Sequence, residues 1–215
     1  LSFTTAHNGY AVVWETSQLA SIYRIDASVY TALGSGDIPL TLDAGDKLGG
    51  RVIGNRIEAY KCISGTWSLA FARTDSTYSA AGKVGLFCAP DSTWRYDDFG
   101  AGSVVSQIFG TTGVLDTFDR PDSTGLGSQW SYLRGDVGGD GGVSSGRAYN
   151  PDSSKYYLMY YNPRTYGPDC EAYLTVVTAP TSDSMGVLAR VADVAGGGGS
   201  YDIFVGGAVS QLWSI

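Results

Sequence analysis

Short runs of β-branched and aromatic residues, separated by Gly, Asp, Ser and Pro, recur roughly every 8–12 residues along the chain. Helical periodicity is almost absent, and 30 glycines among 215 residues supply many turns. Gly54-Asn55 and Ser64-Gly65 fit two-residue hairpin turns. Because strand follows strand with no helix between, we predict an all-β fold, an antiparallel two-sheet β-sandwich. The predicted strands are residues 10–14, 19–26, 29–33, 38–42, 47–53, 56–63, 67–73, 83–89, 95–100, 129–133, 143–145, 147–150, 156–160, 170–177, 185–191, 201–205 and 211–215.

Charge and hydropathy argue against two kinds of partner, nucleic acid and the membrane interior. Lys and Arg number 14 against 21 Asp and Glu, a net charge of −7, so the chain lacks the basic surface that binds nucleic acid. No run approaches the roughly 18 apolar residues of a membrane helix, and residues 1–10 lack the basic start and apolar run of a signal peptide. We therefore expect no nucleic-acid partner and no membrane insertion.

The three cysteines, Cys62, Cys88 and Cys170, are too few and too scattered for a CxxC-type metal site or a disulfide framework. We predict buried free thiols. Cys62 and Cys88 end two predicted strands, so a disulfide between them in an oxidising compartment stays open.

The two ends of the chain carry similar sequences. Residues 9–22 read GYAVVWETSQLASI and residues 200–215 read SYDIFVGGAVSQLWSI. Tyr10 matches Tyr201 at an offset of 191 residues and Gln18 matches Gln211 at an offset of 193, which sets a structural period of roughly 190 residues. The repeat predicts that the chain starts in the middle of one unit and stops at the equivalent point of the next.

The most linker-like stretch is residues 103–114, and it divides the chain. We therefore predict that residues 1–102 are the C-terminal half of a sandwich unit and residues 115–215 are an N-terminal half, with 103–114 as the linker. Such a chain closes as one permuted sandwich, or its halves are completed between subunits, or the sequence is a segment of a longer polypeptide.

Several motifs take a familiar order when the two halves are exchanged. Residues 116–120 (DTFDR) and 125–130 (GLGSQW) then open the unit, 42–48 (LDAGDKL) follows later, and 96–99 (YDDF) closes it. In this order the chain resembles the laminin G-like, concanavalin A-like jelly-roll domains common in tail and other surface proteins of bacteriophages, especially those of actinobacteria. That family opens with D-x-F-x-R and L-G-x-x-W and closes on D-D-F.

The resemblance implies roles for individual residues. Phe118 and Trp130 are implied as core anchors, and the first and last strands of a jelly roll lie side by side, which would bring Asp98 close to Asp116. Residues 9–22 and 200–215 would then compete for one place, so the surplus copy could pair with the sheet edge of another subunit.

Catalytic patterns are missing. Glycosidases need paired carboxylates, yet Glu15, Glu58 and Glu171 have no acidic residue at the alternate positions that share their strand face. We expect these glutamates to be salt-bridged or solvated. His7 is the only histidine, which leaves a Ser or Cys nucleophile without a basic partner elsewhere. The sequence therefore predicts a protein that is not an enzyme.

Aromatic residues are the candidates for ligand binding, because their rings stack on sugars. We select Tyr157, Tyr161, Trp14 and Trp213, with core packing as the competing interpretation. Tyr157 and Tyr161 belong to a tyrosine-rich strand whose alternate residues face opposite ways. One of the two rows must be exposed or covered by a partner.

Calcium is the metal that oxygen ligands from Asp would suit. The candidate ligands are Asp97, Asp98, Asp116 and Asp119, which the jelly-roll layout places on neighbouring strands. The competing interpretation is that these aspartates only stabilise turns.

These observations lead to one expected function. We expect a non-enzymatic structural module located on a virion or in the extracellular space, as a phage tail or decoration component with a role in attachment to host glycans. Its expected partners are other copies of itself or other virion proteins, and a cell-surface glycan. The alternative is a carbohydrate-binding module of a secreted bacterial protein.

Overall fold

A computed structural model describes residues 6–27, 29–34, 38–90, 93–104, 109–110, 112–134, 141–154, 156–179 and 183–194. These residues form strands and turns, with no helix among them. The strands are β1 (Ala6–Glu15), β2 (Leu19–Asp26), β3 (Val29–Ala32), β4 (Ile38–Pro39), β5 (Lys47–Ile53), β6 (Arg56–Ile63), β7 (Thr66–Thr74), β8 (Lys83–Cys88), β9 (Arg95–Ser103), β10 (Val114–Asp116), β11 (Trp130–Arg134), β12 (Gly142–Ser144), β13 (Arg147–Tyr149), β14 (Tyr157–Tyr161), β15 (Cys170–Thr178) and β16 (Ser184–Val194).

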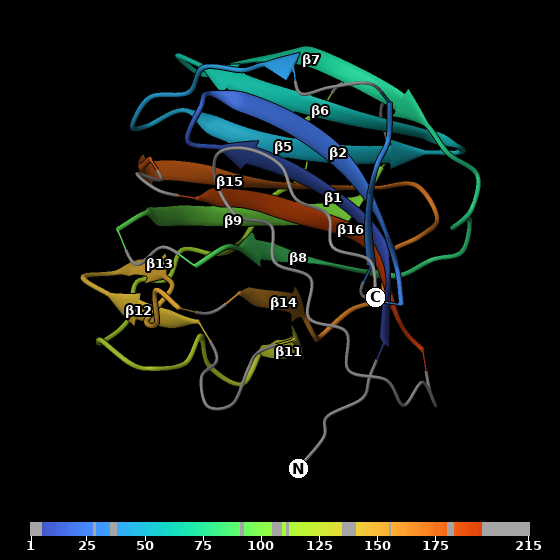
Figure 1. The fold of residues 1–215 in the computed structure, drawn as a ribbon. Coiled ribbons are helices and arrows are strands. Elements are labelled where there is room, and N and C mark those ends of the chain that lie inside the picture. The colour runs from blue at the N-terminus through green and yellow to red at the C-terminus, as the bar shows by residue number, and fades with distance from the viewer. Residues whose placement is uncertain are drawn as a thin grey trace.

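The strands form two sheets that pack face to face (Figure 1). Sheet A has the order β11-β14-β8-β16-β1-β2-β3, with β4 also paired to β2. Sheet B has the order β12-β13-β9-β15-β5-β6-β7, with β10 also paired to β9. All these strand pairs are antiparallel. The predicted all-β antiparallel two-sheet sandwich is confirmed, and the arrangement is compatible with a jelly roll.

In each sheet, strands from the first and second halves of the sequence are interleaved. In sheet A, β8 lies between β14 and β16, and β1 follows β16. In sheet B, β15 lies between β9 and β5. Segments 1–102 and 115–215 therefore contribute strands to both sheets of one sandwich. Pairing of β10 with β9 places Asp116 opposite Phe99 and so next to Asp98, the proximity that the resemblance implied.

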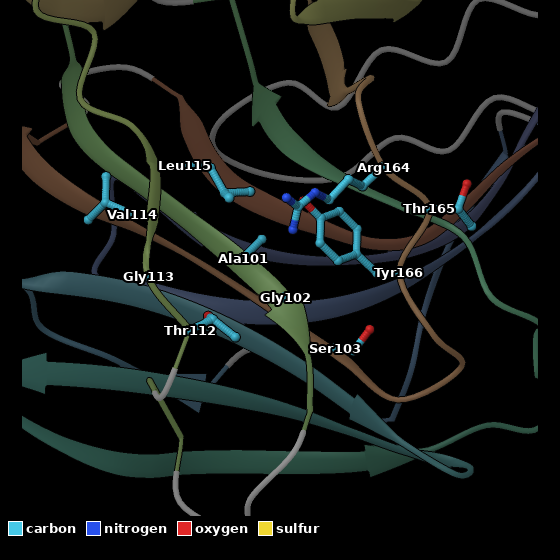
Figure 2. Close-up of a pocket in the computed structure, with 10 residues that line it drawn as sticks. All are labelled: Ala101, Gly102, Ser103, Thr112, Gly113, Val114, Leu115, Arg164, Thr165 and Tyr166. Atoms are coloured by element: carbon cyan, nitrogen blue, oxygen red, sulfur yellow. The ribbon is translucent and has the colours of Figure 1, made fainter.

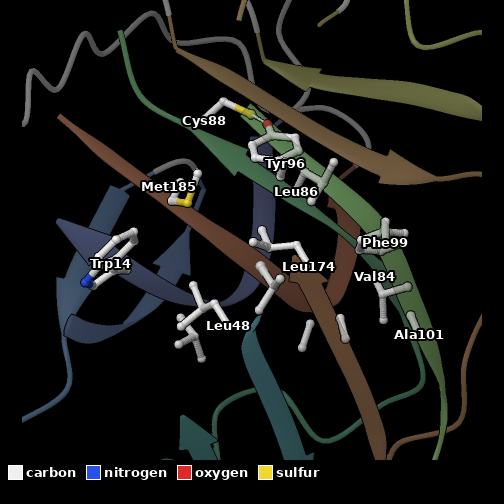
Figure 3. Packing of buried hydrophobic residues seen from close by; sticks show 14 of the residues in the cluster. Trp14, Leu48, Val84, Leu86, Cys88, Tyr96, Phe99, Ala101, Leu174 and Met185 are labelled. Carbon is white, nitrogen blue, oxygen red and sulfur yellow. Dashed lines mark hydrogen bonds between the residues drawn. The ribbon is translucent and has the colours of Figure 1, made fainter. Parts of the chain in front are cut away.

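The main core lies between the sheets and consists of the residues that alternate inward along each strand. In Figure 3, Trp14 and Met185 of sheet A face Leu48 and Leu174 of sheet B. Each fully buried large apolar side chain stabilises the fold by roughly 1.5–3 kcal/mol. The Trp14 indole N–H also donates a hydrogen bond to the Leu40 carbonyl oxygen (2.7 Å), so its polar atom is satisfied in the core.

The two predicted hairpin turns are confirmed. Gly54-Asn55 joins β5 to β6, and Ser64-Gly65 joins β6 to β7. Gly54 and Gly65 have φ values of 56° and 80°. Glycine takes this left-handed conformation without the steric cost of a Cβ, which explains its place in these turns.

All three cysteines are buried and free, as predicted, so the alternative Cys62–Cys88 disulfide is not formed in this structure. Burial raises the pKa of the Cys170 thiol to about 11. That thiol is therefore protonated and unreactive at neutral pH.

Phe109, from the stretch predicted as a linker, packs on the outer face of sheet B. Its ring stacks on that of Tyr60, with centroids 4.2 Å apart, and meets Trp67 edge-on at 4.6 Å. Gly49 lies beneath it, where an added Cβ would come within 2.3 Å of the Phe109 ring. The close approach of Phe109 therefore requires glycine at position 49.

Candidate functional site

The DTFDR motif forms a compact turn around Asp116. The Asp116 carboxylate accepts hydrogen bonds from the Phe118 N–H (2.8 Å) and the Trp130 indole N–H (2.7 Å). It also pairs with Arg120 at 2.8 Å and 3.0 Å. Phe118 and Trp130 are both in the main core, as the resemblance implied. The motif thus ties two core aromatic residues to one buried carboxylate.

Asp97 and Asp98 lie near the start of β9, where β13 and β15 flank it, and Asp119 follows β10 close enough for its charge to act on Asp97. Asp97 pairs with Arg147 at 3.0 Å, and Asp98 pairs with Lys47 at 3.4 Å. Asp119 is exposed. Burial raises the pKa of Asp97, and the negative charges of Asp98 and Asp119 add to this rise.

Asp97, Asp98 and Asp116 therefore already pair with cationic side chains. Within the described ranges, no group of three or more His, Cys, Asp or Glu side chains is placed to hold a metal ion. A calcium ion would have to displace Arg or Lys from these carboxylates. The four aspartates do not form a ready cation cage, and calcium binding stays a prediction.

The candidate sugar-binding aromatic residues have different positions. Trp14, Tyr157 and Tyr161 are 2%, 1% and 8% exposed and belong to the main core. The Tyr161 hydroxyl donates to the Gln129 side chain (2.9 Å). Trp213 lies outside the described residues. The rings of Trp14, Tyr157 and Tyr161 fill the space between the sheets here, so the candidate site is built from other residues.

The second row of the tyrosine-rich strand lies on the outer face of sheet A. Leu158 is buried there in a cluster with Phe87 and Leu188, and Tyr156 and Tyr160 pack against this cluster half-buried. Both rows of β14 therefore make apolar contacts, one in the main core and one on the outer face.

Glu58 is salt-bridged, as expected from its isolation in the sequence. Its carboxylate pairs with Arg51 at 2.7 Å and with Arg56 at 2.6 Å. Burial acts to raise the pKa of Glu58, but the hydrogen bonds from Arg56 and Arg51 outweigh it and the pKa is lowered. The carboxylate is thus held in its charged form, buried between the two arginines.

A surface pocket opens where the end of β9, the start of β10 and the loop between β14 and β15 meet (Figure 2). Its volume is about 480 Å³. The three segments that line it are residues 101–103, 112–115 and 164–166. They are far apart in sequence and come together because β10 pairs with β9 while β15 flanks β9 on its other side. We take this pocket as the candidate functional site.

Tyr166 supplies the most unusual polar group of the pocket. Its side chain is only 5% exposed, and its hydroxyl has no hydrogen-bond partner among the described residues. Two backbone hydrogen bonds with Gly82, of 2.8 Å and 3.1 Å, hold the residue in place. Burial raises the pKa of Tyr166, so the hydroxyl is a neutral donor at neutral pH. An unpaired buried hydroxyl costs about 1–3 kcal/mol. The Tyr166 oxygen is itself buried, so a ligand atom reaches it only after neighbouring side chains move.

Arg164 supplies the positive charge. Figure 2 shows its guanidinium beside the Tyr166 hydroxyl, and the charge acts on that hydroxyl. The Arg164 carbonyl oxygen accepts a hydrogen bond from the Lys83 ammonium (3.0 Å), which fixes the loop. No carboxylate among the described residues forms an ion pair with the exposed Arg164 guanidinium.

Hydroxyl groups complete the polar lining. The Ser103 hydroxyl oxygen accepts a hydrogen bond from the Gly167 N–H (2.9 Å), which leaves its proton to donate. The Thr112 hydroxyl donates to Glu171 (3.0 Å), which leaves its oxygen to accept. Val114 and Leu115 add an apolar side to the pocket. The arrangement suits a small, oxygen-rich ligand with a negative charge.

The far end of the same loop is pinned to the sandwich by Arg190. The Arg190 guanidinium is 2% exposed and donates hydrogen bonds to the carbonyl oxygens of Pro168, Gly54 (2.7 Å) and Tyr78 (2.7 Å). It also pairs with the Asp169 carboxylate at 3.3 Å. These contacts hold the loop in the position that shapes the pocket.

Sequence reasoning missed this pocket. Tyr166 follows the tyrosine-rich strand but was not selected, and Arg164 and Thr112 belong to no motif. Three distant segments form the pocket, so no local spacing marks it. The only sequence signal was an arginine without a neighbouring acid in the segment 162–167 (NPRTYG).

No family model matches the chain, and no curated protein matches it. None of the described residues belongs to a helix long and apolar enough to cross a membrane.

Proposed function

We propose that the chain is a non-enzymatic structural module of a virion or extracellular surface, built on a jelly-roll sandwich, whose pocket binds an acidic glycan of a host cell. The observation that carries the proposal is the position of the Arg164 guanidinium beside the buried Tyr166 hydroxyl, two groups for which the described residues supply no ion-pair or hydrogen-bond partner. Arginine binds carboxylates with two parallel hydrogen bonds. A uronic or sialic acid offers a carboxylate beside several hydroxyl groups.

The lining supports binding in preference to hydrolysis. Residues 101–103, 112–115 and 164–166 include no Asp, Glu, His or Cys side chain. The Glu171 carboxylate lies behind Thr112, fully buried and hydrogen-bonded to it. Glycoside hydrolysis needs two carboxyl groups that flank the bond to be cleaved, and this pocket presents none to a ligand.

A pocket of this size gives weak binding by a single site. Structural modules of a virion or cell surface occur in many copies, and linked copies convert weak sites into strong attachment without new contacts. Other copies of this chain or other virion proteins would then be its structural partners. The proposed attachment function therefore depends on assembly as well as on the pocket.

The binding test compares acidic with neutral sugars. Titration of the full chain with glucuronate and N-acetylneuraminate should show saturable binding, and glucose should bind at least about tenfold more weakly, because a charge-assisted hydrogen bond contributes about 1.5–3 kcal/mol. Arg164→Ala should abolish the preference for the acidic sugars. Lys61→Ala, which removes a positive charge from β6 outside the pocket lining, should leave it unchanged.

Two results would count against the proposal. Equal binding of glucose and glucuronate would remove the role of Arg164, and unchanged binding by Arg164→Ala would place the sugar elsewhere. Light scattering of the same samples adds the second half of the test. A chain that binds acidic glycans but stays monomeric at all concentrations would instead fit the carbohydrate-binding module of a secreted protein.

A further inference from the structure

A second, smaller pocket lies on the other side of the loop that carries Arg164. Its volume is about 200 Å³. It is lined by residues 81–83, Tyr160, Thr165 and residues 191–192. Thr165 lines both pockets, and Figure 2 shows the Arg164 and Tyr166 side chains together while Thr165 points away from them. A single stretch of chain, residues 164–166, therefore forms the wall between the two pockets.

This wall is attached to the sandwich at two points. Tyr166 and Gly82 exchange two backbone hydrogen bonds, of 2.8 Å and 3.1 Å, next to the start of β8. The Lys83 ammonium donates hydrogen bonds to the carbonyl oxygens of Asn162 (2.9 Å) and Arg164 (3.0 Å). The wall is thus held from both sides of Thr165, and the two pockets keep a fixed position relative to each other.

Lys83 brings a positive charge to the second pocket. An ammonium group has three N–H donors, and two of those of Lys83 are used by the carbonyl oxygens of the loop. Carbonyl groups are neutral and leave the charge uncompensated. No carboxylate among the described residues forms an ion pair with Lys83. One N–H and the charge are therefore available to an anion.

The chain as a whole is acidic, with a net charge of −7, but each of the two pockets is lined by a cation. Elsewhere, cations such as Arg51 and Arg147 are paired with carboxylates. The linings of both pockets contain no Asp or Glu. A ligand that places one negative group beside Arg164 and another beside Lys83 therefore gains two charge-assisted contacts.

Tyr160 gives the second pocket an apolar surface. It belongs to the outward row of β14 and packs half-buried against the apolar cluster on the outer face of sheet A. Val191 of the same cluster and Ala192 complete this side of the pocket. An aromatic ring beside polar groups suits a sugar, whose C–H face packs on the ring while its hydroxyl groups bind the polar atoms.

We propose that the two pockets are adjacent subsites for one acidic oligosaccharide. One acidic sugar binds at Arg164, the glycan crosses the loop at Thr165, and a second acidic sugar binds at Lys83 against Tyr160. This inference rests on the proposed glycan binding at Arg164, and it adds the length of the ligand and the spacing of its charges. Because the wall is only one chain thick, successive sugars of the glycan occupy its two sides.

Three ligands test the second subsite in the full chain. They are glucuronate, the disaccharide diglucuronate, and glucuronosyl-glucose, which has the length of the disaccharide but a single carboxylate. In isothermal titration calorimetry, diglucuronate should bind at least about tenfold more tightly than either of the others, a difference of about 1.4 kcal/mol. That factor exceeds the gain from offering two carboxylates to one site.

Ala192→Glu tests the position of the second sugar. Ala192 is exposed, and it lines the second pocket but not the first. A carboxylate there should repel the second acidic sugar and remove the advantage of diglucuronate, while the affinity for glucuronate stays unchanged. The matched control is Ser68→Glu, which adds the same charge at an exposed position of β7 outside both linings. It should leave both affinities unchanged, and circular dichroism should show both variants folded.

Three outcomes would overturn the second subsite while the proposed function stands, because glucuronate would still bind through Arg164. The first is diglucuronate binding no more tightly than glucuronate. The second is equal binding of diglucuronate and glucuronosyl-glucose, and the third is an advantage of diglucuronate that survives Ala192→Glu. If glucuronate itself does not bind, or binds equally well to Arg164→Ala, the proposed function fails and this inference fails with it.

Discussion

The loop between β14 and β15 contains polar groups of two kinds: some are bonded to Arg190, and others have no partner among the described residues. Its second half is pinned, because the buried Arg190 guanidinium donates to the Pro168 carbonyl oxygen and pairs with Asp169. The loop also carries Arg164 and Tyr166. Within the part of the chain that the structure describes, the Arg164 guanidinium forms no ion pair and the Tyr166 hydroxyl has no hydrogen-bond partner. Residues 162–169 thus contain groups that bond to Arg190 of β16 as well as groups for which the described residues supply no partner.

The difference separates structural from binding roles. Polar groups whose hydrogen bonds are all made inside the protein have nothing left to offer a ligand, and their loss damages the fold. Groups left unpaired in a pocket contribute little to stability and are ready to bind. The following substitutions test that separation, from the largest expected effect to the smallest.

Arg190→Ala should destabilise the fold most. The substitution leaves the carbonyl oxygens of Pro168, Gly54 and Tyr78 without their donor in a buried position. We expect a loss of about 3–5 kcal/mol in the free energy of unfolding, as for other broken buried charge networks. Urea unfolding followed by tryptophan fluorescence measures it. Arg164→Ala, on the loop that Arg190 contacts, is the matched control and should change stability by less than about 0.5 kcal/mol. Similar losses for both variants would end the distinction between the two kinds of polar group.

Asp75→Asn should have the next largest effect at neutral pH. The Asp75 carboxylate accepts hydrogen bonds from Tyr10 (2.8 Å), Arg24 (2.8 Å) and the Thr77 N–H (2.9 Å). Hydrogen bonds to a charged group contribute about 1.5–3 kcal/mol, and we expect a loss in that range. Burial acts to raise the pKa of Asp75, but the hydrogen bonds from Thr77, Tyr10 and Arg24 outweigh it and lower the pKa to about 2.

The lowered pKa gives Asp75 a defined pH dependence. The unfolded value is 3.8, so the stabilisation is present above about pH 4 and is lost as the pH falls towards 2. Urea unfolding at pH 6, 4 and 2.5 should show the difference between wild type and Asp75→Asn shrinking at the lowest pH. A difference that stays constant from pH 6 to 2.5 would mean that the carboxylate is not held in its charged form.

Most strands could be predicted from the sequence, but the buried hydrogen bonds of Arg190 could not. Alternation and turn residues predicted β5 and β6 at their observed bounds, because strand period and hairpin turns are local properties. Arg190 sits inside a predicted strand, and nothing near it in the sequence indicates its partners Gly54 and Tyr78. The pocket was missed for the same reason, since its three walls meet only through the order of strands in sheet B.

Tyr10→Phe should cost less than Asp75→Asn, because it removes one partner of that carboxylate and leaves the others. The Tyr10 hydroxyl donates to Asp75 (2.8 Å) and accepts from the Tyr78 N–H (3.0 Å). We expect a loss of about 0.5–1.5 kcal/mol in the free energy of unfolding. In a double-mutant cycle with Asp75→Asn, the two losses should be less than additive, because the residues share a hydrogen bond. Full additivity would show that the hydroxyl does not act through Asp75.

Tyr166→Phe should have the smallest effect on stability and is the sharpest test of the comparison. It makes the same chemical change as Tyr10→Phe, but the hydroxyl that it removes has no hydrogen bond to lose. Removing an unpaired buried hydroxyl relieves a desolvation penalty, so the free energy of unfolding should stay within about 0.5 kcal/mol of wild type or rise. Glucuronate binding should nevertheless weaken about threefold to tenfold, because the ligand loses a donor. A loss of stability equal to that of Tyr10→Phe would show that the Tyr166 hydroxyl is satisfied inside the protein. The unpaired donor on which the binding proposal depends would then not exist.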